Sequence, residues 1–158
     1  MATSIPLNMS KILIAAVVAC IGLAGSGTVA GAGPFSATGI VIAILAGDLF
    51  LGEAEGHLSG AGTLAIRSQR APGLTCLGQF TSSAELGGSG HMHCSDGTTA
   101  TFQFQRLGVF RGHGVGNASR GSMSFAYGLT ADEAGPYLRL PEGKKLTHNG
   151  TELELAGL

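Results

Sequence analysis

The distribution of charged and apolar residues divides the chain into two parts. Residues 12–47 contain no charged side chain, whereas charged and polar residues recur from Asp48 onward. Residues 12–32 supply about the 20 apolar positions that a helix needs to cross roughly 30 Å of hydrocarbon. A Gly-Pro pair then ends this stretch, and residues 35–47 are too few to span a bilayer comfortably. We predict a transmembrane helix over 12–32, followed by a segment that lies at the membrane interface, enters the membrane in part, or leads into the first strand.

The apolar N-terminus admits three interpretations. Val17 to Cys20 resembles a bacterial lipobox, in which the cysteine is lipidated and the preceding residues are removed. An uncleaved anchor instead places Lys11 in the cytoplasm and the rest of the chain outside. A helical hairpin is disfavoured because its second segment is short. We adopt the retained anchor, so that residues 1–47 form a membrane anchor with a cytoplasmic N-terminus and residues 48–158 form a periplasmic domain.

Small residues recur every three or four positions along the predicted helix. Small side chains allow close approach of helix backbones in a bilayer, where packing drives association. The pattern therefore favours a helix with neighbours in the membrane, although membrane helices and signal peptides are rich in alanine and glycine in any case. The residues expected at the helix contact are Ala15, Ala19, Gly22, Ser26, Gly27, Ala30 and Gly31.

Beyond Asp48 the pattern is that of short strands separated by glycine-rich turns. Phe102 and Phe104 alternate with glutamines, which is typical of a strand with one buried face. The Asp96-Gly97 pair is a strong hairpin signal. We predict a mainly β fold, an antiparallel sandwich or small barrel built as a glycine-rich meander. The expected strands cover 49–58, 63–68, 74–80, 90–94, 98–107, 109–116 and 121–127.

The last thirty residues carry two local signals. Thr130 and Glu133 have the spacing of a capping box, which predicts a short helix near 130–135 that cannot pass the following Gly-Pro pair. Further on, Asn149-Gly150 separates two runs of alternating residues and predicts a C-terminal hairpin.

Composition narrows the classes of partner. Nine Lys and Arg against ten Asp and Glu leave no basic excess, which argues against nucleic-acid binding. Charged residues make up only 12% of the chain, far below the usual quarter or so, which indicates contact with lipid or a protein partner. The 27 glycines suit a small curved sheet, in which bends and close backbone approach tolerate them.

The cysteines and histidines of the β-domain suggest a disulfide more strongly than a metal site. Cys76 and Cys94 fall on neighbouring expected strands, and such pairs outside the cytoplasm most often form a disulfide. His91 and His93 share one strand face and are weak candidates for metal ligands. Cys94 should point to the opposite face from both, which argues against a shared ion.

The sequence contains no G-x-S-x-G or H-E-x-x-H motif, and the remaining histidines are isolated among glycines and turns. We therefore expect no catalysis and no cofactor. The stretch 49–127, with Cys76 followed by the C-S-D-G turn at Cys94–Gly97, resembles small uncharacterised proteobacterial envelope proteins. Those proteins carry a glycine-rich β-domain behind a lipoprotein-like or membrane-anchoring N-terminus. The resemblance covers about half the chain and implies a compartment without a mechanism.

Together these features predict a non-catalytic, membrane-anchored accessory subunit of a larger bacterial membrane complex. Its expected partners are membrane lipid and integral membrane protein subunits. Two alternatives stay open: a free outer-membrane lipoprotein lipidated at Cys20, and a small β-barrel that binds a ligand or a metal.

Overall fold

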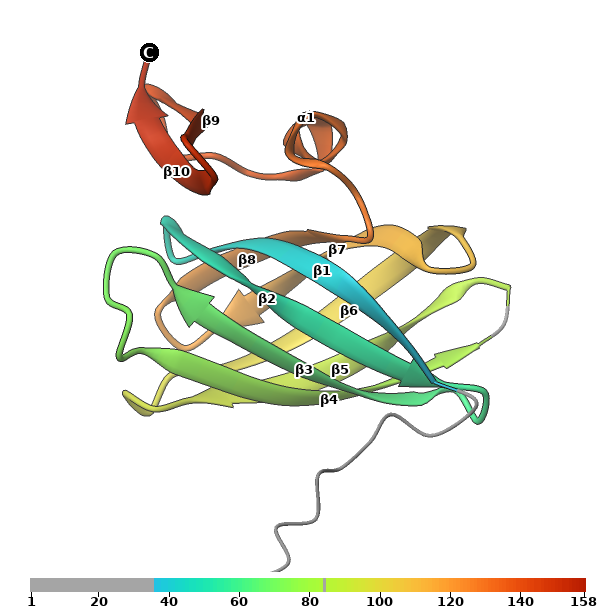
Figure 1. The fold of residues 1–158 in the computed structure, drawn as a ribbon. Coiled ribbons are helices and arrows are strands. Elements are labelled where there is room, and N and C mark those ends of the chain that lie inside the picture. The colour runs from blue at the N-terminus through green and yellow to red at the C-terminus, as the bar shows by residue number, and fades with distance from the viewer. Residues whose placement is uncertain (1–35, 84) are drawn as a thin grey trace, which may run out of the picture. The chain divides into compact units, whose positions relative to one another are not determined.

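A computed structural model describes residues 36–83 and 85–158, which form an eight-stranded antiparallel β-barrel followed by a short helical turn and a hairpin (Figure 1). Each barrel strand pairs with its neighbour in sequence, and β1 pairs with β8 to close the barrel. The barrel strands are β1 (Ser36–Leu45), β2 (Asp48–His57), β3 (Ala61–Ser68), β4 (Thr75–Ser83), β5 (Gly87–Cys94), β6 (Thr99–Gly108), β7 (Arg111–Ala118) and β8 (Gly121–Tyr127). They are followed by α1 (Ala131–Ala134), the 3-10 turn η1 (Gly135–Tyr137), β9 (Lys144–Asn149) and β10 (Glu152–Gly157).

The mainly β, antiparallel fold is confirmed, and of the two predicted architectures the chain adopts the barrel. The seven expected strands correspond to β2 through β8, with shifts at their ends. The largest shifts flank the β4–β5 turn, where β4 continues to Ser83 and β5 already begins at Gly87. Strand β7 begins two residues late, at Arg111, so that Val109 and Phe110 lie in the turn before it. A glycine-rich run with few large side chains defines a strand end poorly, because its alternation is visible only where side chains are present.

Strand β1 occupies most of the apolar segment that was expected to belong to the anchor. Val41 and Ala43 face the barrel interior, and Ile42 and Ile44 pack under the C-terminal segment. A strand buried on both faces reads as a continuous apolar run, which explains why this segment lacks charges. The β-domain therefore begins at or before Ser36, earlier than the expected boundary between residues 47 and 48.

The predicted transmembrane helix over 12–32 lies outside the described residues, together with Cys20 and the small residues of its expected contact. Over residues 36–83 and 85–158, no helix combines the length and apolar character needed to cross a membrane.

Inward-facing glycines let aromatic rings cross the barrel interior. Gly62 lies opposite Phe80, and Gly114 lies opposite Phe125. A Cβ added at either glycine would come within 2.1 Å or 2.4 Å, respectively, of the ring opposite. A small barrel alternates small and large interior residues to fit its taper, and here glycine takes the small positions. Close ring contact thus accounts for much of the glycine content of these strands.

The C-terminal segment covers the outer face of β1, β2 and β8. Leu138 and Leu153 pack there on a buried cluster that includes Ile42 and Leu49. The capping box is present at the start of α1, and Glu133 also forms an ion pair with Arg111 at 2.7 Å. This segment therefore covers the outer side of the seam, by which we mean the pairing of β1 with β8 that closes the barrel.

Candidate functional site

One end of the barrel is filled by buried side chains. Phe50, Met92 and Met123 are among the largest fully buried residues, and the Cys76–Cys94 disulfide lies on the same inner face. The two cysteines are direct partners in the pairing of β4 with β5, which confirms the predicted disulfide. Eight-stranded barrels are narrow enough for side chains to fill. Among the described residues, buried side chains and the disulfide therefore occupy this half of the interior.

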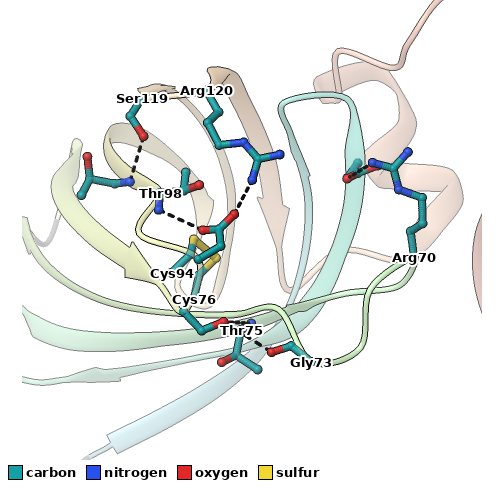
Figure 2. A network of polar contacts seen from close by, with 12 residues as sticks. Arg70, Gly73, Thr75, Cys76, Cys94, Thr98, Ser119 and Arg120 are labelled. Carbon is teal, nitrogen blue, oxygen red and sulfur yellow. Dashed lines mark hydrogen bonds and ion pairs between the residues drawn. A yellow bond between two sulfur atoms is a disulfide. The ribbon is translucent and has the colours of Figure 1, made fainter.

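Polar contacts join the turns around that filled end, as Figure 2 shows. The Ser95 hydroxyl accepts from the Thr75 N–H at 3.2 Å and so connects two turns. Arg120 forms an ion pair with Asp96, and the Thr98 backbone N–H donates to the same carboxylate at 2.9 Å. The hydrogen bond from the Thr98 N–H, helped by the charge of Arg120, lowers the pKa of Asp96. We call the turns 46–47, 69–74, 95–98 and 119–120 the polar end.

The opposite end of the barrel contains a cavity of about 520 Å³. Small residues of β1 and β2, including Gly39, Ala54 and Gly56, leave this space open. Phe80 and Phe104 form part of its wall, with their ring centroids 5.6 Å apart and their planes near perpendicular. Ligand sites in proteins commonly have volumes of about 300–1,000 Å³ and mostly apolar walls. The cavity therefore has the size and the lining of a small-molecule site.

A few polar groups line the cavity beside the apolar walls. Arg106 follows Phe102 and Phe104 on the inner face of β6, and its Nη2 donates to the Ser82 hydroxyl at 3.4 Å. Tyr127 is half-buried beside it, and burial raises the pKa of its phenol, opposed by the positive charge of Arg106. No aspartate or glutamate is found among the described residues that line this space. The cavity thus combines an apolar interior with one arginine.

The two histidines singled out as weak metal candidates lie elsewhere. His91 and His93 project from the outer face of β5, with ring centroids 6.1 Å apart, while Cys94 points inward as predicted. Over residues 36–83 and 85–158, no group of three or more His, Cys, Asp or Glu side chains could hold a metal ion. Neither histidine lines the interior cavity.

A second hollow, of about 940 Å³, lies on the outer wall of β3 to β7. Its lining includes exposed polar side chains such as Gln79, His91 and Thr101. Exposed polar groups are well hydrated and give a ligand little apolar area to bury. The interior cavity is therefore the stronger candidate.

The sequence analysis did not single out Arg106, although the pattern of β6 contains a signal for it. Phe102, Phe104 and Arg106 continue one period-two series, so an arginine follows two phenylalanines on the buried face of a strand. A charged residue on an apolar face is uncommon unless it is paired or functional. The cavity itself could not be found this way, because it depends on which small residues meet at one end.

Comparisons with protein-family models, with curated proteins and with solved structures gave no match to this chain. The resemblance to proteobacterial envelope proteins therefore stays a prediction.

Proposed function

We propose that the barrel binds one small, mostly apolar molecule with an anionic group, such as a single-chain carboxylate. The apolar part would occupy the cavity, and the anion would lie beside Arg106. The observation that carries this proposal is the 520 Å³ interior space with apolar walls, one arginine and no carboxylate in its described lining. The sequence analysis left open a small β-barrel that binds a ligand or a metal, and this proposal takes up the ligand and not the metal.

The apolar walls account for affinity. Each methylene removed from water contributes about 0.8 kcal/mol, which corresponds to roughly fourfold in the dissociation constant. Affinity should therefore rise by about this factor for each methylene added to an alkyl carboxylate, until the chain fills the cavity. Beyond that length the gain should stop.

Arg106 accounts for selectivity at the polar group of the ligand. A guanidinium presents donors in a planar fork that matches a carboxylate or phosphate, and it keeps its charge at any relevant pH. Because the surrounding walls include Phe104 and Tyr127, the arginine meets the ligand in a partly dehydrated setting. An alkylammonium of equal length should bind far more weakly, since it brings a like charge to this arginine.

The test is titration calorimetry of the full-length protein in lipid nanodiscs with alkyl carboxylates of increasing length and with the matching alcohols and amines. Arg106→Gln should weaken the binding of carboxylates at least tenfold and change the binding of alcohols little. Arg67→Gln, on the outer face of β3, is the matched control. Gly56→Leu should block long chains, because a Cβ at Gly56 meets only ordinary contacts and the side chain extends into the cavity. Thr63→Leu on the outer face controls for it.

Two results would overturn this proposal. One is an absence of saturable binding for any chain length in protein that is folded by circular dichroism. The other is binding that neither Arg106→Gln nor Gly56→Leu alters, which would place the ligand outside the cavity.

The accessory-subunit function predicted from the sequence is a second proposal, carried by the small-residue pattern of residues 12–32. Replacing Gly22, Ser26 and Ala30 together with leucine should release the protein from its complex during mild detergent purification. Unchanged co-purification would remove the helix from the contact. An intact mass that begins at a lipidated Cys20 would instead favour the lipoprotein alternative.

A further inference from the structure

Exposed apolar side chains gather on three turns around the mouth of the cavity. The β2–β3 turn presents Leu58, the β4–β5 turn presents Leu86, and the β6–β7 turn presents Val109 and Phe110. Their exposed fractions are 82%, 80%, 69% and 60%. We call these four residues the apolar rim. Single exposed apolar residues are ordinary, but a group from turns distant in sequence at one end of a barrel marks an interaction surface.

The turns at the polar end provide the contrast. Among the described residues, none of the large exposed hydrophobic side chains lies on those turns. They carry instead two ion pairs, Arg70 with Asp48 and Arg120 with Asp96. The asymmetry runs along the barrel axis and coincides with the cavity mouth, so one end of the molecule is suited to water and the other to an apolar environment.

The connection of the chain identifies that environment. Strand β1 begins at Ser36, which pairs with His57 beside the β2–β3 turn, and both residues line the cavity. Whatever precedes Ser36 is therefore attached at the end that carries the apolar rim. The sequence that precedes it includes residues 12–32, which are free of charge and long enough to cross a bilayer.

We propose that the apolar rim rests on a lipid bilayer, with its four side chains in the interfacial region and the cavity mouth facing the lipid. An apolar ligand then passes between the bilayer and the cavity without crossing water. The docking itself follows from the rim and the chain attachment. Only the passage of a ligand rests on the proposed binding function.

The charges near the rim indicate which lipids are needed. Arg111 is paired with Glu133, and Glu85 lies beside Leu86 on its turn. This is not the polybasic cluster that recruits proteins to anionic lipid. Docking should therefore occur on zwitterionic phosphatidylcholine and change little with salt, since its strength scales with the apolar area inserted.

The absence of tryptophan from the chain provides a clean probe of orientation. Single variants Phe110→Trp and Leu58→Trp report on the rim, and Pro72→Trp reports on the polar end. Full-length protein is reconstituted in phosphatidylcholine vesicles with and without brominated acyl chains. Bromine should quench the two rim tryptophans at least twofold and leave the tryptophan at position 72 unchanged.

Each other outcome overturns the docking proposal. Unquenched rim tryptophans with a blue-shifted emission would mean that the N-terminal segment covers the rim. Rim emission that depends on protein density but not on bromine would mean that a second copy covers it. Quenching of position 72 would mean the opposite orientation. The quenching measurements need no ligand. They therefore test the docking proposal even if the proposed ligand binding is wrong.

A kinetic experiment then tests the passage of ligand. Val109→Ser with Phe110→Ser removes two rim residues, and Leu77→Ser with Val115→Ser removes two exposed apolar residues from the outer wall as the matched control. Loading of a fluorescent alkyl carboxylate from the host bilayer should slow at least tenfold in the rim variant only. Because Val109 and Phe110 also line the cavity, equilibrium affinity is measured alongside, and the loading rate should fall by a larger factor than the affinity. Equal rates in both variants would show that the ligand enters from water.

Discussion

The two ends of the barrel are built from the same strands but differ in how the interior is filled and in which side chains the turns expose. At the polar end, large side chains and a disulfide fill the interior, and hydrogen bonds and ion pairs connect the turns above them (Figure 2). At the other end, small residues leave a cavity of about 520 Å³, and the turns expose apolar side chains. The difference teaches that the packing that stabilises the barrel is concentrated away from the end where binding is proposed.

This division has an energetic consequence. A cavity forgoes packing contacts that a filled core would make, so the stability lost there must be supplied elsewhere. A binding site also benefits from rigid support, which the filled end and the closed strand ladder provide. Substitutions at the two ends should therefore separate stability from binding.

The largest effect should come from comparing a buried and an exposed phenylalanine. Phe50→Ala should lower the free energy of unfolding by about 3–5 kcal/mol, because it empties a fully packed position. Phe110→Ala should change it by less than about 0.5 kcal/mol, since that ring is exposed. Urea denaturation measures both. Similar losses for the two variants would contradict the proposed division.

Removing the disulfide tests the filled end in a second way. The double variant Cys76→Ala, Cys94→Ala should lose about 3 kcal/mol of stability, because an 18-residue separation no longer restrains the unfolded chain. Cavity binding by the folded fraction should persist. In unreduced, unfolded wild-type protein, maleimide should react with neither Cys76 nor Cys94, and reaction with both would show that the bond is absent in solution.

Alanine substitutions at two inward-facing glycines should lower stability by different amounts, because the new Cβ atom meets different neighbours at each position. Gly62→Ala should cost about 1–3 kcal/mol, because the new Cβ meets both the Phe80 ring and the Glu55 carbonyl. Gly56→Ala should be nearly neutral, since its Cβ would make only ordinary contact with the Phe80 ring. Thermal unfolding compares the pair. A neutral Gly62→Ala would mean that the rings have room to move.

The smallest effect concerns acid. The pKa of Asp96 is lowered in the folded state, chiefly by the Thr98 N–H, so its contribution to stability is present above the unfolded value of 3.8. That contribution is lost as the pH falls through the lower, folded pKa. Asp96→Asn should therefore flatten the acid limb of the stability profile measured by urea at several pH values. Asp132→Asn, at the exposed carboxylate on α1, is the control.

The sequence predicted the strands that have one buried face and missed the strand that has two. The alternation of Phe102 and Phe104 located β6, and the disulfide was predicted because Cys76 and Cys94 fall on neighbouring expected strands. Strand β1 gave no alternation, since the C-terminal segment buries its outer face around Ile42. A membrane segment and a doubly buried strand share the same apolar composition, so pattern alone could not separate them.

The site was less accessible to sequence reasoning than the fold. Its volume depends on strand register, which brings Gly39, Ala54 and Gly56 to one end of the barrel. Its mouth depends on turn lengths, which place Leu58 and Phe110 at that same end although they are far apart in the chain. Both properties arise from barrel closure, which no local pattern encodes.

Closure also sets an order on biosynthesis. Strands β2 through β8 each form next to the strand just made, but the pairing of Val41 with Tyr127 must wait until β8 has left the ribosome. Until then the growing sheet has two open edges, and the outer face of β1 around Ile42 and Ile44 has no cover. Open edges and bare apolar strands promote aggregation. A nascent chain that stalls before residue 127 should therefore depend on chaperones, and one that ends before Leu153 should close its barrel yet leave part of the seam uncovered.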